Sequence, residues 1–186
     1  MLTSYKDSWV EYNYSLMQRV LSGEKFIKIY SPGGLETKIL KHGIAHGPLW
    51  GGNMCLLINR LGTNESLNTD GVILFLEDID EYLYSFERML VHMREASMFD
   101  NIKGLIFGEL KDMKDQEIKF ERNTDQIILD ICGDLDIPIV SNFPCGHGEF
   151  QSTLPLSINT EIDTRNKDCL LYTSPSPRVA YGARLP

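Results

Sequence analysis

Two residues in this sequence, Glu77 and His147, have the chemistry of an acid–base pair. Glu77 directly follows the apolar run 72–76, and His147 lies between two glycines in the segment 143–149. An imidazole exchanges protons near neutral pH, and a carboxylate beside it orients the ring and stabilises its charged form. The alternative is structural, with Glu77 as one acid of a helix-capping cluster and His147 as an ordinary loop residue.

The run 72–76 organises the elements around Glu77. Its branched and aromatic residues predict a strand that is buried on both faces. A helix over residues 80–95 is expected next, because its apolar residues recur with the helical period. Asp78 or Asp80 would cap this helix. In open α/β sheets ligands bind at the carboxyl ends of strands, so the junction at Glu77 is a candidate site.

The remaining pattern predicts an α/β fold, a mixed sheet with flanking helices. Further helices are expected at residues 8–21, 54–61 and 123–132. Strands are expected at 25–30, with a return strand at 36–40, and at 103–108, 136–142 and, as a short edge strand, 159–162. Residues 111–121 form a charged loop with no assigned chemistry.

The segment Gly51-Gly52-Asn53 follows Trp50 and precedes the expected helix at 54–61. It predicts a glycine turn with Asn53 as the helix N-cap. Backbone N–H groups at such a turn can bind an anion or a carboxylate, which makes these residues candidates for substrate binding. The simpler interpretation is a tight turn and a cap.

Composition excludes several classes of protein. The chain has 186 residues, sufficient for one domain with a sizeable core, and its net charge of -8 argues against non-specific nucleic-acid binding. No apolar run approaches the roughly 20 residues of a membrane span, and residues 1–11 lack a signal-peptide pattern. The four cysteines form no CxxC pair and no zinc spacing. We expect reduced thiols in a cytoplasmic protein without a membrane partner.

Three segments together are similar to one family. They are residues 47–53 with Leu61-Gly62-Thr63; residues 73–78 with Glu81, Tyr84 and Arg88; and residues 142–147 followed by Leu154-Pro155-Leu156. In this order and spacing they resemble the muramoyl-tetrapeptide LD-carboxypeptidases, a family that includes the microcin C immunity peptidases. The resemblance covers residues 25–163 and corresponds to the C-terminal domain of these enzymes.

The resemblance implies a serine peptidase with a Ser–Glu–His triad and no metal or cofactor. Glu77 and His147 match its acid and base, and Gly51, Gly52 and Asn53 are expected to face the substrate. Such an enzyme would release the terminal D-alanine of murein tetrapeptides during cell-wall recycling in the cytoplasm, commonly as a homodimer.

One feature of the family has no counterpart, because the sequence contains no Gly-x-Ser-Asp-like turn for the nucleophile. We therefore expect residues 1–24 to be a hinge or the tail of an absent N-terminal nucleophile domain, and the chain alone to be inactive. Residues 169–178 resemble the translation of a sequencing adapter and have no helix or strand period. Residues 164–186 are accordingly expected to be a non-native, disordered tail.

Other functions stay open on the sequence. The enzyme could instead cleave peptidyl-nucleotide antibiotics such as processed microcin C, or the domain could bind muropeptides without catalysis. A metal hydrolase using Glu77, Asp78 and His147 is disfavoured, because a second histidine in a ligand pattern is lacking. A thiol hydrolase using Cys145 is disfavoured, because Cys145 and His147 are too close together on one glycine turn for a nucleophile–base contact.

Overall fold

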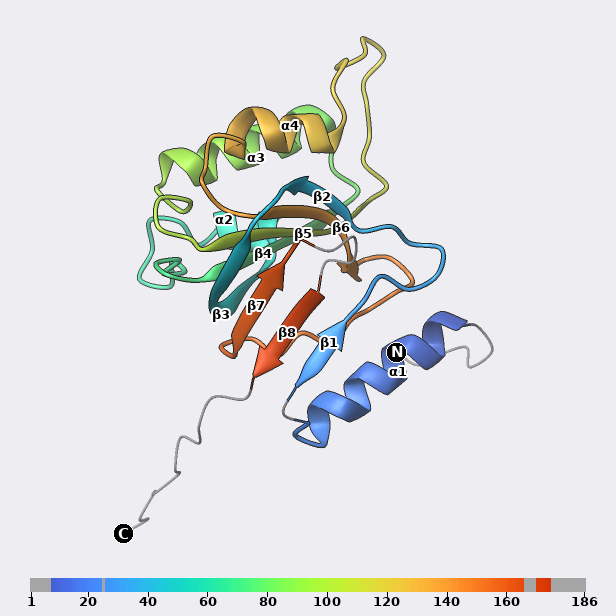
Figure 1. Cartoon of the computed structure of the whole chain (residues 1–186). Coiled ribbons are helices and arrows are strands. Elements are labelled where there is room, and N and C mark those ends of the chain that lie inside the picture. Colours follow the sequence, from blue (N-terminus) through green and yellow to red (C-terminus); the bar gives the residue numbers. More distant parts are fainter. Residues whose placement is uncertain (1–7, 25, 166–169, 175–186) are drawn as a thin grey trace.

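The computed structural model describes residues 8–24, 26–165 and 170–174 (Figure 1). The elements, in chain order, are α1 (Ser8–Leu21), β1 (Ile27–Ile29), β2 (Lys38–Lys41), β3 (Ile44–Asn53), α2 (Met54–Ile58), β4 (Ile73–Ile79), α3 (Leu83–Glu95), β5 (Gly104–Lys111), α4 (Thr124–Cys132), β6 (Ile139–Gly146), β7 (Asn159–Asp163) and β8 (Leu170–Ser174).

The described strands form one mixed sheet in the order β1-β8-β7-β3-β4-β5-β6-β2. Strands β3 to β6 are parallel, and the outer pairings are antiparallel. Residues 44–48 of β3 pair with β7, whereas residues 49–53 pair with β4, so this long strand connects the two parts of a curled sheet (Figure 1). The predicted fold class, a mixed sheet with flanking helices, is therefore confirmed.

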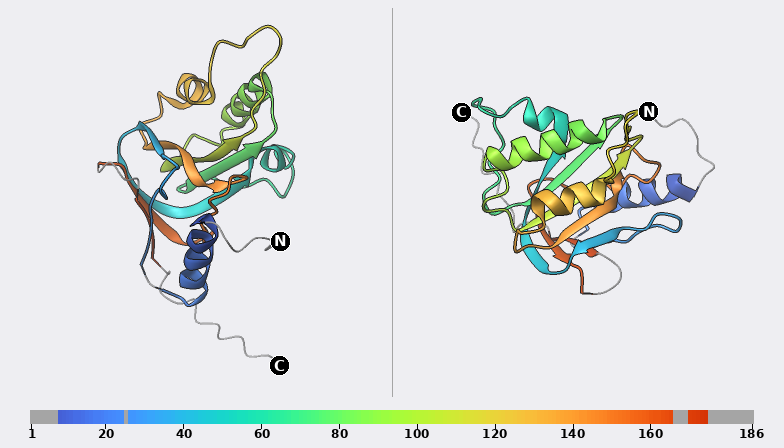
Figure 2. Two further views of the ribbon diagram at one scale, coloured as in Figure 1. Left: turned by 90° about the vertical axis from the view of Figure 1, so that its right-hand side faces the viewer. Right: turned by 90° about the horizontal axis from the view of Figure 1, so that it is seen from above.

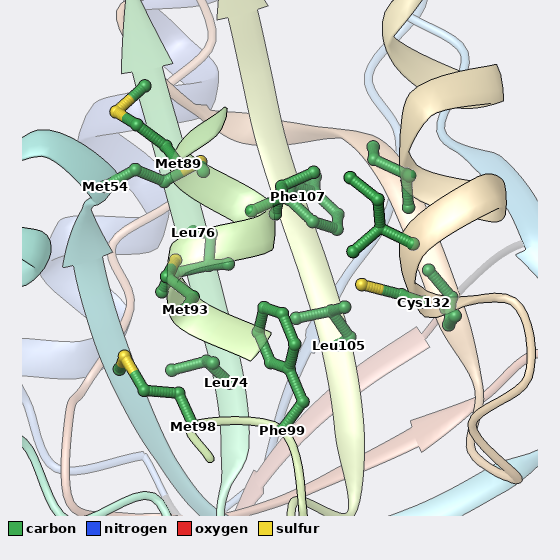
Figure 3. Close-up of a cluster of buried hydrophobic side chains, with 14 of the residues drawn as sticks. Met54, Leu74, Leu76, Met89, Met93, Met98, Phe99, Leu105, Phe107 and Cys132 are labelled. Carbon is green, nitrogen blue, oxygen red and sulfur yellow. The ribbon is translucent and has the colours of Figure 1, made fainter. Parts of the chain in front are cut away.

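Two apolar clusters pack on opposite faces of the parallel strands. Leu74 and Leu76 of β4 point into the cluster beneath α3 and α4 (Figure 3), whereas Ile73 and Phe75 point into the cluster on the α1 side. Figure 2 shows α3 and α4 covering one side of the sheet and α1 lying on the other. Side chains alternate along a strand, so burial of both sets explains the continuous apolar run.

The structure corrects the expected glycine turn at residues 50–53. These residues continue β3, and only then does the short helix α2 begin, with Asn53 as its N-cap. Pairing with β4 keeps the backbone extended through Gly51 and Gly52. The expected helix at 54–61 stops at Ile58, and turns follow it.

The acids after the central run also differ from expectation. β4 extends through Glu77 to Ile79, and the N-cap of α3 is Tyr82, which makes no side-chain capping bond. The Asp78 carboxylate accepts hydrogen bonds from Cys55 N and Asn53 Nδ2, so it supports the start of α2. Asp80 pairs with Lys114. The prediction that Asp78 or Asp80 caps α3 is wrong, because Asp78 is still part of β4 and α3 begins only at Leu83.

Two predicted strands differ from expectation in their pairing, and a third strand was not predicted. β1 pairs with β8 and β2 pairs with β6, so the expected return strand does not pair back on its predecessor. β7 is an interior strand between β3 and β8. Residues 170–174, for which no strand was expected, form β8 by pairing with β7 and β1. Residues 166–169 and 175–186 of the expected tail lie outside the described residues.

Candidate active site

Glu77 and His147 are in direct contact. The Nδ1 atom of His147 lies 2.6 Å from Oε2 of Glu77, although 70 residues separate them in the chain. The Glu77 side chain is 11% exposed and that of His147 is 43% exposed. A partly buried carboxylate at this distance makes a strong, charge-assisted hydrogen bond to an imidazole N–H. The pair lies near the carboxyl ends of β4 and β6, the edge where ligands bind in α/β sheets.

The strand between these two residues makes the contact possible. Glu77 is on β4 and His147 follows β6, so β5 lies between their strands. Gly108 of β5 occupies the gap, and a Cβ there would lie 3.1 Å from the Glu77 Cβ and 2.2 Å from the Cys145 carbonyl oxygen. The absence of a side chain at Gly108 therefore leaves the space that Glu77 and the Cys145 carbonyl occupy.

The hydrogen bond assigns the tautomer of His147. A carboxylate only accepts hydrogen bonds, so Nδ1 carries the proton that points to Glu77. In the neutral ring Nε2 then bears the free lone pair. Nε2 makes no hydrogen bond within residues 8–24, 26–165 and 170–174. The arrangement can accept a proton at Nε2 while Glu77 stabilises the resulting imidazolium.

The predicted substrate-binding residues lie beside this pair. In the parallel register of β3 and β4, Asn53 is opposite Glu77. The Asn53 side chain is engaged on both sides, since Oδ1 accepts from Leu56 N and Nδ2 donates to Asp78. Gly52 has open space in the direction of a Cβ, with no atom within 4 Å. Its open side makes Gly52 the residue of the three that leaves most room for a ligand.

Gly51 has a different, structural reason to be glycine. Its φ is +140°, and a Cβ would lie 1.8 Å from the Phe75 carbonyl oxygen on β4. Any larger residue would separate the two strands at the point where they approach the acid–base pair. Gly51 thus holds β3 against β4, and its assignment to substrate binding stays a prediction.

Asp78 and Cys145 occupy positions unlike those that the alternative hydrolases need. The Asp78 carboxylate accepts hydrogen bonds from Asn53 and Cys55 at the start of α2, and it has no hydrogen bond to His147. In the described part of the chain no three His, Cys, Asp or Glu side chains gather as metal ligands. Burial raises the pKa of the Cys145 thiol to about 12, so its nucleophilic thiolate form is disfavoured.

A second carboxyl group, that of Glu109, lies beside the residue after His147 and was not among the predicted site residues. It packs against Gly148, where a Cβ would meet its carboxylate oxygens at about 2 Å. Its Oε1 is buried without a hydrogen-bond partner among the described residues. Burial raises the pKa of Glu109, an effect that Lys111 partly opposes and Glu149 reinforces. Glu109 lies between the predicted strand 103–108 and the predicted charged loop 111–121, so neither prediction included it, and in the structure it is part of β5.

No helix in the described ranges is both long and apolar enough to cross a membrane.

Comparison with known proteins identifies similar chains. Residues 46–162 match the family described as "LD-carboxypeptidase C-terminal domain". The chain is 27% identical over 129 residues to the probable murein peptide carboxypeptidase of Bacillus subtilis, covering 69% of this chain and 40% of that protein. It is 30% identical over 131 residues to the microcin C7 self-immunity protein MccF of Escherichia coli, covering 68% and 36%. The chain thus spans about two fifths of these relatives.

The fold also matches a solved structure. The muramoyltetrapeptide carboxypeptidase of Oxalobacter formigenes superposes with a TM-score of 0.77 and 23% sequence identity. The match covers 89% of this chain and 56% of that one. At this identity the likeness concerns the fold, and it agrees with the arrangement of strands and helices described above.

Proposed function

Since this chain belongs to the family of LD-carboxypeptidase C-terminal domains, we propose that it supplies the acid–base half of a serine-type carboxypeptidase. The enzyme hydrolyses the bond to the terminal D-alanine of murein tetrapeptides, a step of cell-wall recycling. The observation that carries the proposal is the 2.6 Å contact between His147 and Glu77 at the carboxyl ends of the parallel strands.

The proposed mechanism uses both residues in two proton transfers. Nε2 of His147 takes the proton of a serine hydroxyl as the serine oxygen bonds to the substrate carbonyl carbon. The imidazolium, held by Glu77, then protonates the amine of the leaving D-alanine as the peptide bond breaks. In the second half His147 takes a proton from water, whose oxygen attacks the acyl group, and returns the proton to the serine.

We propose that the serine lies in an N-terminal domain that is not part of this sequence, and that this chain alone does not hydrolyse the substrate. The sequence has no Gly-x-Ser-Asp turn, and the chain spans about 40% of the Bacillus subtilis relative. In the complete enzyme, a cytoplasmic homodimer, the open side of Gly52 faces the bound peptide.

A second candidate is the cleavage of a peptidyl-nucleotide such as processed microcin C. It is favoured by the 30% identity to MccF, which is slightly higher than the 27% identity to the Bacillus subtilis relative. The acid–base chemistry is the same for both substrates, because each reaction breaks an amide bond by acyl transfer. The two candidates differ only in the groups that surround the bond to be cleaved.

A chimera tests these proposals. The N-terminal half of the Bacillus subtilis relative is joined to this chain, and hydrolysis of a murein tetrapeptide and of processed microcin C is measured by mass spectrometry. We expect the chimera to be active on the tetrapeptide and His147→Ala to lower its activity by at least about a thousandfold, as for other triads. Preference for processed microcin C would favour the second candidate.

The matched control is His92→Ala, which removes an exposed histidine from the last turn of α3. It should leave the activity of the chimera unchanged. Hydrolysis by the 186-residue chain without the added half, or full activity of the His147→Ala chimera, would contradict the proposed roles. Sedimentation of the chimera tests the homodimer.

A further inference from the structure

Helix α1 contacts the loop that carries His147. The loop leaves β6 after Gly146 and returns at Ser152, whose N–H donates to the Pro144 carbonyl at 2.7 Å. The views in Figures 1 and 2 place α1 on this side of the sheet, next to β1. Leu16 of α1 is 5% exposed and packs into the apolar cluster on the α1 side of the sheet.

Asn13 makes the closest connection between the helix and the loop. Its Nδ2 donates to the carbonyl of Glu149 at 2.9 Å, and its Oδ1 accepts from the N–H of Gln151 at 2.6 Å. One side-chain amide thus binds a backbone C=O and a backbone N–H two residues apart. These contacts satisfy two polar groups of the loop that lack partners in a strand or helix. They add to a bond inside the loop, from Gln151 Nε2 to the Gly148 carbonyl at 2.7 Å.

Tyr12 adds a second connection. Its hydroxyl donates to the Tyr30 carbonyl at 3.0 Å and lies 2.8 Å from the Ser152 Oγ. Its ring packs edge-to-face on Phe150, with centroids 5.6 Å apart. Tyr12 therefore ties together α1, the end of β1 and the returning part of the loop.

The His147 side chain itself has little support. It is 43% exposed, and in the described part of the chain its ring is hydrogen-bonded only to Glu77. Glycines flank it on both sides, so the local backbone resists rotation weakly. The position of the ring then depends on how well the rest of the loop is held, and α1 provides that support from outside the sheet.

We propose that Asn13 is a positioning residue for His147, and that α1 is thereby a working part of the active site. This inference rests on the proposed function for its catalytic meaning, whereas the positioning itself concerns the chain alone. Release of the Asn13 contacts lets residues 148–151 move, and the imidazole then spends less time within hydrogen-bond distance of Glu77.

The test compares Asn13→Ala with Gln18→Ala in the 186-residue chain. Gln18 is an exposed amide on the same helix, and its side chain has no hydrogen bond to other described residues. NMR follows amide hydrogen exchange at residues 148–151 and the Nδ1-bound proton of His147, which is assigned by its absence in His147→Ala. We expect Asn13→Ala to speed loop exchange about tenfold and to broaden the Nδ1 proton signal, with no change in Gln18→Ala.

Unchanged loop exchange in Asn13→Ala, or faster loop exchange with an unchanged Nδ1 proton, would overturn the proposal. If Asn13→Ala does not fold, Asn13→Asp serves instead, since it keeps an acceptor for the Gln151 N–H and removes the donor to the Glu149 carbonyl. In the active chimera we expect Asn13→Ala to lower kcat about tenfold with little change in KM. A chimera without activity would count against the proposed function, while the NMR result would still decide the positioning.

Discussion

Replacement of Asp78 by Asn tests how far the hydrogen bonds of this buried carboxylate stabilise the fold. Asp78 is 3% exposed; its Oδ2 accepts from Cys55 N at 3.2 Å, and its Oδ1 accepts from Asn53 Nδ2 at 3.1 Å and from Ile79 N at 2.9 Å. In Asp78→Asn one of these oxygens becomes an NH2 group that faces another donor. Asn53 cannot turn its amide to compensate, because its Oδ1 caps α2 at Leu56 N.

The expected cost follows from these contacts. A hydrogen bond to a charged group contributes about 1.5–3 kcal/mol, so Asp78→Asn should lower the free energy of unfolding by about 2 kcal/mol. With a urea m-value of about 2 kcal/mol/M, the unfolding midpoint falls by about 1 M. The midpoint is measured by circular dichroism in a urea titration at pH 7.

Asp80→Asn is the matched control. Asp80 has the same side chain two residues further on, but it is 63% exposed and pairs at the surface with Lys114. Its φ is +64°, a conformation that Asn tolerates well, so the substitution removes charge without strain. We expect its midpoint to match that of the unaltered protein. Equal losses in the two variants, or no loss in Asp78→Asn, would refute the stabilising role of the Asp78 hydrogen bonds.

Three further predictions concern the rim of the site. Gly51→Ala should abolish folding, because its Cβ would lie 1.8 Å from a carbonyl oxygen of β4. Gly52→Ala should fold, because its Cβ has open space, but with a lower urea midpoint, because its φ of +154° is unfavourable for alanine. Burial raises the pKa of the Glu109 carboxyl group in the folded protein above its value in the unfolded chain. The free energy of unfolding therefore decreases as the pH rises from the unfolded pKa to the folded pKa. Glu109→Gln should therefore raise the urea midpoint at pH 8 relative to the unaltered protein, and an equal gain at pH 4 would contradict the cause. Iodoacetamide at pH 8 should alkylate exposed Cys55 and spare Cys145, whose pKa burial raises to about 12, as peptide mass spectrometry would show.

Local pattern was sufficient for elements whose own residues form the core. The apolar run 72–76 predicted a strand buried on both faces, and its side chains do divide between two clusters. The helical period after it placed five apolar residues inside; four of them are buried and the first, Leu83, is partly buried: Leu83, Phe86, Met89, Leu90 and Met93. In these segments the spacing of the apolar residues itself predicts which side chains are buried and therefore which element forms.

Pattern failed where distant partners decide the conformation. Residues 50–53 have the glycines of a turn, yet they extend because β4 pairs with them. β8 lacks an alternating pattern and forms by pairing with β1 and β7. A strand whose backbone is held from both sides does not need strong intrinsic propensity, so its sequence carries little local signal.

The acid–base pair combines both situations. Each residue could be placed at the end of a strand from its own surroundings, but their contact depends on the order of strands, in which β5 separates β4 from β6. Gly108 of β5 lies between the two strands, and its lack of a side chain leaves room for Glu77 and for the Cys145 carbonyl. A glycine within an apolar strand weakens the strand unless another group needs its space, so Gly108 was a signal in the sequence that two groups meet across that position. Asn13 carried no such signal, because its role arises only when α1 folds against a loop 136 residues away.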